Sequence, residues 1–310
     1  MKYFKDQSCD FIRPVLTMGT FDGVHLGHEK LLKCAVQKAV EKNTKSVVLS
    51  YYHHPLETIH KKTFPYLLTQ REKKEKLIKD CGIDYVLNLD FNKRIAQMSA
   101  QDFLKQIIID KIGAQCLVVG YDTHFGRGRE GNIQFLKDNA VKNYYCLEVV
   151  EPVMMGNQII SSSLIRDYIR EGDLVKANKF LGHDYSVHGF VVTGHRIGRE
   201  MGFPTINVIP FDDNKLIPAI GVYICKVFVN GSKYAGVTNI GYSPTIKTSR
   251  VKQIEMHILD FNEDVYNKDV EVCFIKRLRD EKIFKDKQEL INSIAADVKV
   301  TRKYFKQKNS

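Results

Sequence analysis

A single stretch of sequence decides how this chain folds: Thr17-Met18-Gly19-Thr20-Phe21-Asp22-Gly23-Val24-His25-Leu26-Gly27-His28. An apolar strand pattern at residues 14–16 leads into it, and a long helical pattern begins near His28. Glycines, an aspartate and two histidines therefore lie in a strand-to-helix turn. The N-terminus of a helix presents N–H groups and a positive dipole end to anions, and glycine lets a ligand approach the backbone. We expect phosphate groups to bind here.

The two histidines of this turn strengthen the phosphate interpretation. His25 and His28 are three residues apart, about one helical turn, so both imidazoles can face the same ligand. Imidazoles can donate hydrogen bonds to phosphoryl oxygens. A single histidine is more often structural than catalytic, and His-x-Gly-His alone is a short pattern. The complete turn is far more specific, and it favours phosphate binding.

The first 183 residues alternate short apolar strands with longer amphipathic helices. We expect strands at residues 15–18, 46–52, 85–90, 116–120 and 145–150, and helices at residues 28–42, 70–81, 100–112 and 133–143. This order predicts an α/β Rossmann-like domain with a parallel sheet and helices on both faces. In such a sheet ligands bind at the carboxyl ends of the strands, where the turn at residues 17–28 would lie.

After His183 the pattern changes to strands joined by tight turns. We expect strands at residues 185–193, 222–229, 234–240, 254–261 and 270–276, and a final helix at residues 287–306. Asn230-Gly231 is a strong signal for a two-residue hairpin. This order predicts a small antiparallel β-barrel closed by a C-terminal helix. We therefore expect two abutting domains, residues 1–183 and 184–310, without a long linker.

The composition fits a two-domain protein that binds polyanions. The 310 residues carry a formal charge of +11, which suits nucleotides, and equally nucleic acid or an acidic membrane surface. We interpret most lysines, such as those at residues 71–76, as solvated helix surface. The seven cysteines are scattered singly and are interpreted as small buried hydrophobes in a reducing cytoplasm. No signal-peptide core and no apolar run long enough to cross a bilayer is recognisable.

Two more polar segments follow the predicted strands of the first domain. Residues 120–132 are rich in glycine and arginine and could wrap a phosphate or stack on a flat ring, while an ordinary surface loop is an equally good interpretation. Residues 160–166 read Ile-Ser-Ser-Ser-Leu-Ile-Arg. Serine at the start of a helix is a common cap. Here it also brings hydroxyls and a helix N-terminus beside a guanidinium, which together would bind a departing pyrophosphate.

The second domain holds its polar residues in two places. Residues 194–207 interleave basic residues with glycines and end in Gly-Phe-Pro-Thr-Ile-Asn. Thr205 and Asn207 face one way if this segment is extended, and hard oxygen donors suit magnesium. The pair alone is weak evidence. Glu255 stands between two apolar residues in an alternating strand, which by itself indicates a solvated outward side chain.

The turn at residues 17–28 resembles the Thr-x-Gly-x-Phe-Asp-x-x-His-x-Gly-His signature of the nucleotidylyltransferases, in the form typical of bacterial bifunctional riboflavin kinase/FMN adenylyltransferases. The resemblance implies that His25 and His28 are catalytic. It also implies that ATP and its phosphates are bound by Gly19, Phe21, Asp22, Gly23, Ser162, Ser163 and Arg166. Ser163 replaces the usual threonine and keeps the hydroxyl.

The loop at residues 120–132 is similar to the Gly-x-Asp-Phe-x-Phe-Gly loop of the same family. Asp122, Phe125 and Gly126 match that loop, so the resemblance implies that they contact the flavin or the nucleotide. Thr123 stands where an aromatic residue is usual. The resemblance therefore does not carry the aromatic contact over to that position.

The second domain resembles the riboflavin kinases, whose Gly-Phe-Pro-Thr-x-Asn signature occupies residues 202–207. The resemblance implies ATP binding by Gly198, Gly202, Pro204, Thr205 and Asn207. It further implies that Thr205 and Asn207 hold Mg²⁺ and that Glu255 is the catalytic base. The motifs of both families occur in the expected order over residues 14–300.

The resemblance implies a bifunctional, ATP-dependent transferase of FAD biosynthesis. Riboflavin and ATP would give FMN, and FMN with a second ATP would give FAD and pyrophosphate. The riboflavin alcohol needs a base and metal-bound ATP, whereas the FMN phosphate is already an anion and needs charge neutralisation around the reacting phosphates. We expect small-molecule partners, no nucleic acid and no membrane, and a cytoplasmic monomer or weak homo-oligomer.

Two alternative functions remain open at this point. One is a nucleotidylyltransferase that acts on another phosphate, such as a phosphopantetheine or a nicotinate nucleotide, with an unrelated β domain; the ordered kinase motifs argue against it. The other is a basic RNA-binding or flavin-sensing protein on a retired catalytic scaffold. The presence of Glu255, Thr205, Asn207, His25 and His28 together disfavours a retired site.

Overall fold

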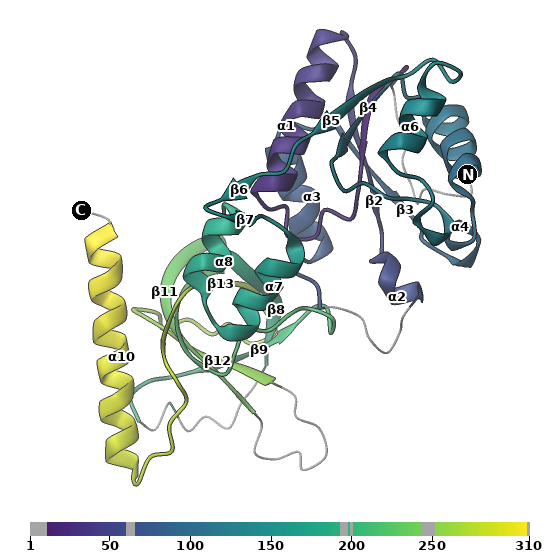
Figure 1. Ribbon diagram of the computed structural model, residues 1–310. Coiled ribbons are helices and arrows are strands. Elements are labelled where there is room, and N and C mark those ends of the chain that lie inside the picture. Colours follow the sequence, from purple (N-terminus) through teal and green to yellow (C-terminus); the bar gives the residue numbers. More distant parts are fainter. Residues whose placement is uncertain (1–10, 60–65, 193–197, 199–200, 243–251, 309–310) are drawn as a thin grey trace. The chain divides into compact units, whose positions relative to one another are not determined.

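The computed structural model describes residues 11–59, 66–192, 198, 201–242 and 252–308 (Figure 1). By their internal contacts they form two compact units. The N-terminal unit comprises Met1–Pro65 and Arg71–Ser162, and the C-terminal unit comprises Tyr66–Gln70 and Ser163–Ser310. The predicted domain boundary after residue 183 lies further along the chain than this division at Ser162, and it stays a prediction.

The N-terminal unit is built on a five-stranded parallel sheet in the order β3-β2-β1-β4-β5 (Figure 1). Its strands are β1 (Val15–Met18), β2 (Ser46–Tyr51), β3 (Tyr85–Leu89), β4 (Cys116–Gly120) and β5 (Cys146–Val150). All five were expected within one residue of these bounds. β1 lies in the centre, hydrogen-bonded to β2 on one side and β4 on the other, so the turn that follows it leaves from the middle of the sheet.

Helices surround this sheet because its strands are apolar on both faces. Leu16 and its neighbours on one face pack against the π-helix η1, while Val15 and Val48 on the other face pack against α1. The helices are α1 (Leu26–Glu41), α2 (Pro55–Ile59), α3 (Arg71–Asp80), α4 (Lys93–Ala96), α5 (Ala100–Asp102), η1 (Phe103–Ile112), the 3-10 turn η2 (Arg127–Arg129) and α6 (Ile133–Ala140). A short hairpin, β6 (Met154–Met155) and β7 (Gln158–Ile159), follows β5. The α/β Rossmann-like prediction is confirmed.

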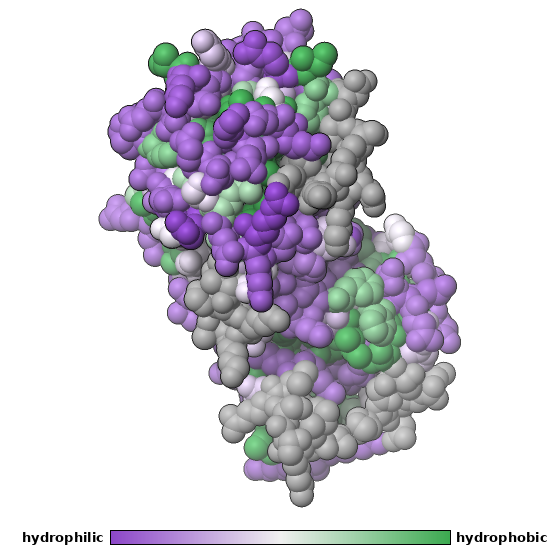
Figure 2. Space-filling view, turned by 90° about the vertical axis from the view of Figure 1, so that its right-hand side faces the viewer, coloured by the Kyte–Doolittle hydropathy of each residue, from purple (hydrophilic) through white to green (hydrophobic). Residues whose placement is uncertain are grey.

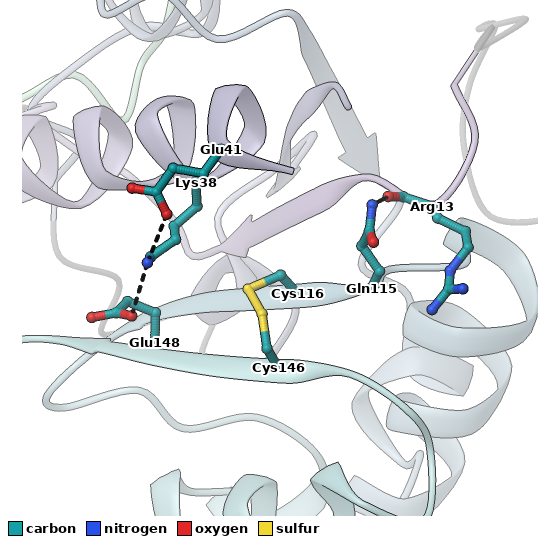
Figure 3. The surroundings of a disulfide bond; sticks show 7 residues. All are labelled: Arg13, Lys38, Glu41, Gln115, Cys116, Cys146 and Glu148. Atoms are coloured by element: carbon teal, nitrogen blue, oxygen red, sulfur yellow. Dashed lines mark hydrogen bonds and ion pairs between the residues drawn. A yellow bond between two sulfur atoms is a disulfide. The ribbon is translucent and has the colours of Figure 1, made fainter. Parts of the chain in front are cut away.

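A disulfide joins β4 and β5, which corrects the interpretation of the cysteines. Cys116 and Cys146 are direct partners in the parallel register, with their Cα atoms 4.4 Å apart and their sulfurs bonded (Figure 3). For this pair, the expectation of separate buried hydrophobes is wrong. Thirty residues separate the two cysteines in sequence, and only the register of the sheet brings them together. Cys225 and Cys273 are buried and form no disulfide, as expected, whereas Cys34 and Cys81 are only partly buried. Cys9 lies outside the described residues.

The C-terminal unit is a closed barrel with the strand order β10-β11-β12-β9-β8-β13. Its elements are α7 (Ser162–Glu171), α8 (Leu174–Leu181), β8 (Tyr185–Val192), β9 (Ile206–Pro210), β10 (Gly221–Val229), β11 (Ser232–Tyr242), β12 (Lys252–Ile258), β13 (Asp269–Arg279) and the C-terminal helix α10 (Lys287–Lys308). The predicted antiparallel barrel with a final helix is confirmed. The hairpin at Asn230 and Gly231, with φ of 51° and 76°, is confirmed too, because both residues take the positive φ that a type I′ turn requires.

One strand of the barrel was not expected. β9 pairs with both β12 and β8 and thereby closes the sheet. The sequence at residues 202–210 contains two prolines and a glycine, which obscured the alternation of a strand. Its first residues, Ile206 and Asn207, belong to the segment that carries the expected metal ligands, so the missed strand fixes the position of that segment.

The surface agrees with the polar composition. Figure 2 shows that hydrophilic residues cover much of the coloured surface on the visible face, with apolar residues in several separate small areas. Among the residues that the structure describes, no helix has both the length and the apolar character needed to span a membrane.

Candidate active sites

The turn after β1 is held in an unusual backbone conformation. Gly23 has a φ of 92°, and two residues that are not glycine, Phe21 and Val24, also have positive φ values of 50° and 40°. A positive φ is rare for a bulky residue and particularly for a β-branched one. Both side chains are buried, at 1% and 4% exposure, and their packing holds the strained turn in place. Strain of this kind gathers at functional sites.

His25 ends the turn and caps α1. Its Nδ1 accepts a hydrogen bond of 3.3 Å from the backbone N–H of His28, so α1 begins at Leu26, two residues earlier than expected. An imidazole that accepts at Nδ1 carries its proton at Nε2 when it is neutral. Gly27 permits this geometry, because a Cβ there would lie 3.1 Å from two atoms of the His25 ring. The glycine of His-x-Gly-His therefore makes room for the first histidine.

His28 stacks on His25, with ring centroids 3.7 Å apart and planes inclined by 14°. Burial lowers the pKa of His28 well below 6.5, and the neighbouring His25 and Lys74 lower that pKa further. His28 is thus neutral at pH 7. Its Nδ1 is buried and has no hydrogen-bond partner among the described residues. The stacked pair therefore presents a neutral His28 imidazole at the start of a helix, and an arriving anion would favour proton uptake by His28.

The serine element is joined to this turn inside the N-terminal unit. The Ser162 hydroxyl donates a hydrogen bond of 2.8 Å to the backbone carbonyl of Asp22, whose side chain is also buried. Two of the predicted phosphate-binding segments, far apart in sequence, are thereby brought together. Ser163 and Arg166 belong to the C-terminal unit. Ser163 is exposed, while Arg166 is buried and its Nε donates to the carbonyl of Tyr66 at 2.9 Å.

The loop after β4 follows the strand next to β1. The strand order reverses between these two strands, which is where open α/β sheets bind ligands. Phe125 is buried between the rings of Phe103 and Phe135, at centroid distances of 5.5 and 5.9 Å. Gly126 has a φ of 73°, and a Cβ there would lie 2.6 Å from the backbone nitrogen of Ala100. These two expected site residues therefore anchor the loop.

The remaining residues of the first site lie at the edges of these elements. Asp122 is exposed at the start of the loop after β4. Its backbone carbonyl lies 2.8 Å from Nδ1 of His124. The backbone N–H of Gly19 donates to the carbonyl of Leu49 at 3.1 Å, which ties the third residue of the turn to β2. The roles of all these residues toward ATP and flavin remain predictions.

The barrel brings together the three side chains that sequence reasoning assigned to the kinase. Asn207 of β9 is the direct partner of Glu255 of β12 in the sheet, and the Thr205 hydroxyl donates to Oε1 of Glu255 at 2.7 Å. Glu255 is partly exposed, while Ile254 and Met256 on either side are buried at 1% and 0% exposure. The carboxylate therefore projects away from the barrel core, as the alternation predicted.

The glycine-rich segment before β9 packs tightly against the same site. A Cβ on Gly198 would lie 2.5 Å from the carbonyl oxygen of Phe203 and 3.0 Å from Oγ1 of Thr205. Gly202 has a φ of 81°. Pro204 is exposed, and its carbonyl lies 2.8 Å from Nδ1 of His257. Residues 193–197 and 199–200 of this segment lie outside the described residues.

Sequence reasoning missed two residues of this cluster. His257 follows Glu255 on the same face of β12, and its ring also meets Phe203 edge to face at 5.5 Å. Asn239 of β11 is the partner of Glu255 on the side opposite to Asn207. The two-residue period of β12 could have pointed to His257, whereas Asn239 depends on the register between strands.

The donor atoms at this site fit a hard divalent cation. They are the hydroxyl of Thr205, the side-chain amide of Asn207 and the carboxylate of Glu255, and oxygen is the ligand that magnesium prefers. Within the described parts of the chain there is no cluster of three or more histidine, cysteine, aspartate or glutamate side chains placed to hold a metal. A metal here would therefore depend on a few protein oxygens, together with water and substrate phosphates.

Two family models match successive parts of the chain. The FAD synthetase family model matches residues 10–164, and the riboflavin kinase family model matches residues 181–305. A solved structure described as a macrolide-efflux protein from Streptococcus pneumoniae is 30% identical, with a TM-score of 0.87 over 97% of both chains.

Curated relatives match along almost the whole chain. A bifunctional riboflavin kinase/FMN adenylyltransferase from Bacillus subtilis is 36% identical, over 94% of this chain and 93% of the relative. Its counterpart in Escherichia coli K12 is 35% identical, over 94% of this chain and 92% of the relative. The counterpart in Buchnera aphidicola from Acyrthosiphon pisum is 36% identical, over 94% of this chain and 93% of the relative. The chain therefore belongs to the bifunctional riboflavin kinase/FMN adenylyltransferase family.

Proposed function

We propose that this chain makes FMN from riboflavin and ATP in its C-terminal unit, and FAD from FMN and a second ATP in its N-terminal unit. The observation that carries the proposal is the succession of two family matches, FAD synthetase and then riboflavin kinase, over residues 10–164 and 181–305. Both reactions are transfers from ATP, of a phosphoryl group in the first and of an adenylyl group in the second. The two transfers need different chemistry: adenylyl transfer to an anionic phosphate needs stabilisation of charge, and phosphoryl transfer to an alcohol also needs a base. The residues of the two candidate sites differ in the same way.

In the N-terminal unit, the residues are suited to stabilise charge. His25 and His28 would donate hydrogen bonds to the phosphates of ATP, at a helix N-terminus whose backbone N–H groups attract the same anions. The residues Gly19, Phe21, Asp22 and Gly23 would shape the turn around the nucleotide. By the resemblance, Ser162 of this unit would bind the departing pyrophosphate together with Ser163 and Arg166, which belong to the C-terminal unit. The FMN phosphate attacks as an anion, so this site needs no general base.

The flavin or nucleotide would meet the loop after β4. Phe125 and Gly126 are buried in or packed on the core and would hold that loop in position, while Asp122 is exposed and available for a direct contact. We propose that the loop closes the side of the site next to the turn at residues 17–28, because β4 and β1 are neighbours in the sheet.

In the C-terminal unit, the residues are suited to proton removal. Glu255 would accept the proton of the riboflavin hydroxyl as that oxygen attacks the γ-phosphorus of ATP. Mg²⁺ bound by Thr205 and Asn207 would neutralise the ATP phosphates, and Gly198, Gly202 and Pro204 would form the loop over them. The Thr205 hydroxyl donates a hydrogen bond to Glu255, so its oxygen keeps lone pairs for a metal.

The proposal includes a cytoplasmic location, where ATP is supplied, and small molecules as the only partners: riboflavin, FMN and ATP, with FAD as the product. It includes neither nucleic acid nor a membrane, and it takes the chain as a monomer or weak homo-oligomer.

The experiment that tests the function is a product profile. Purified protein is incubated with riboflavin, ATP and Mg²⁺, and the flavins are separated by chromatography with fluorescence detection. We expect FMN to appear first and FAD to follow. FMN without FAD would overturn the assignment of the N-terminal unit, and phosphopantetheine and nicotinate mononucleotide would then be tested as acceptors. Absence of any flavin product would favour a binding protein.

A further inference from the structure

Lys74 is a buried lysine on α3, a helix whose lysines were expected to be exposed to solvent. The run of charged residues in α3 was interpreted as solvated surface, and the exposed Lys76 fits that interpretation. Lys74 does not, because only 9% of it is exposed. Lysine is almost never buried unless its ammonium has partners. The interpretation of the run as solvated surface is therefore wrong at this position, and the cause lies in what the ammonium contacts.

The Lys74 ammonium joins the ends of two strands. Nζ donates to the carbonyl oxygen of Thr20 at 3.4 Å, in the turn after β1, and to the carbonyl oxygen of Tyr51 at 3.2 Å, at the end of β2. Its third partner is the buried hydroxyl of Ser50 at 3.1 Å. An ammonium has three donors, so these oxygens use all of them. The side chain thus fastens the strained turn to the neighbouring strand.

Nearby carboxylates partly offset the cost of burying the charge of Lys74. Burial lowers the pKa of Lys74, and Arg71 on the same helix lowers it as well. Three carboxylates act in the opposite direction on that pKa: Asp22 in the turn, Glu75 on α3 and Glu57 on α2. The three hydrogen-bond acceptors themselves are neutral oxygens. A positive charge is therefore kept inside the protein at the carboxyl edge of the sheet, next to the turn at residues 17–28.

The charge of Lys74 also lowers the pKa of His28. The pKa of His28 is lowered first by burial, then by His25 and then by Lys74. Phe21, whose ring centroid lies 5.3 Å from that of His28, is uncharged. Lys74 therefore acts on the two parts of the site that matter for anion binding, the backbone of the turn and the protonation of His28.

We propose that Lys74 is a positioning residue for adenylyl transfer, whose buried ammonium fixes the phosphate-binding turn and places a positive charge beside it. The turn begins at Thr17 on the central strand, and Lys74 holds its fourth residue, Thr20, against β2. The fixed charge favours a polyphosphate at this edge of the sheet and disfavours a second cation at His28. His28 consequently stays neutral until the negative charge of the nucleotide arrives.

This inference rests on the proposed formation of FAD in the N-terminal unit, and its test separates charge from hydrogen bonding. Lys74→Gln removes the charge and keeps amide donors, and Lys74→Arg keeps the charge. Lys76→Gln, an exposed lysine of the same helix, is the matched control. For each full-length variant, kcat and KM for ATP in FMN-to-FAD conversion are measured, and the pKa of the His28 ring is followed by NMR in the absence of ligands.

We expect Lys74→Gln to lower kcat for FAD formation by up to about 100- to 1,000-fold, the loss typical of removing one preorganised electrostatic contact. It should also raise the pKa of His28 and shift the acidic limb of the pH profile in the same direction. Lys76→Gln should resemble the wild type in all three respects. FMN formation from riboflavin should be unchanged in every variant, because the barrel does not contain Lys74.

An unchanged kcat and an unchanged His28 pKa in folded Lys74→Gln would overturn the inference. The glutamine amide can still donate hydrogen bonds to the turn, so this result would mean that the charge of Lys74 has no role. If Lys74→Gln does not fold, Lys74→Arg decides: it must keep FAD formation within about 10-fold and keep the His28 pKa low. A wild-type protein that forms no FAD would refute the proposed function instead, and the His28 pKa would still report whether Lys74 acts on it.

Discussion

The two candidate sites of this chain differ in the charge that they offer to ATP. At the turn after β1, the side chains are two stacked imidazoles and a buried ammonium, at the start of a helix. At the barrel, the central group is a carboxylate that accepts a hydrogen bond of 2.7 Å from a threonine. The first arrangement can stabilise negative charge, whereas the second can also remove a proton. The difference matches the nucleophiles of the two proposed reactions, an anionic phosphate and a neutral alcohol.

The largest effect is expected at the barrel. Glu255→Gln keeps the size of the side chain but removes the base, and we expect riboflavin phosphorylation to fall by about 100- to 10,000-fold, the usual contribution of general base catalysis. Conversion of FMN to FAD should be unchanged. Steady-state rates with riboflavin and with FMN as separate substrates measure both. Loss of FAD formation from FMN in a folded variant would show that the sites are not independent.

The reciprocal change is His28→Ala. It removes one neutral hydrogen-bond donor from the turn, so FAD formation should fall by about 100- to 1,000-fold while FMN formation from riboflavin continues. The same two assays apply. Because the ring also packs on His25, the fold of the variant is checked by circular dichroism. A variant with full activity toward FMN would remove His28 from the mechanism.

A smaller effect is expected from Gly198→Ala. The added Cβ would lie 2.5 Å from the carbonyl oxygen of Phe203, so the loop and Thr205 must move. We expect a cost of about 1–3 kcal/mol, expressed as a higher KM for ATP in the kinase reaction. Gly231→Asn is the control, because Gly231 has open space around it and asparagine tolerates its positive φ. An unchanged KM in Gly198→Ala would mean that the loop does not bind ATP.

The smallest expected effect is the pH dependence of folding stability that His28 causes. Its pKa lies below 6.5 in the folded chain, so the unfolded chain binds the proton first as the pH falls. The free energy of unfolding should therefore decrease below about pH 6.5, by at most about 1.4 kcal/mol per pH unit. Urea unfolding of wild type and His28→Gln between pH 7.5 and 5 measures the difference. A histidine that titrates at or above 6.5 by NMR would contradict it.

Most of the N-terminal sheet could be predicted, because its strands are short apolar runs that alternate with amphipathic helices. The same holds for the placement of the turn at residues 17–28, which the Gly and His spacing marks clearly. The barrel was predicted less completely. β9 was missed because the glycine and prolines in and before it are typical of a loop. Asn239 was missed because its position depends on pairing with Glu255.

The sequence by itself determined the fold class of both units and the order of most of their elements, because hydrophobic periodicity and motif spacing are local properties of the chain. It also supplied the predicted residues of both sites. Only the tertiary structure decided which distant residues meet: Cys116 with Cys146, Thr205 with Glu255, and Lys74 with Thr20 in the turn after β1. It also decided that His28 is neutral and that Lys74 is buried. Burial and strand register depend on how segments pack, and no pattern within a single segment contains that information.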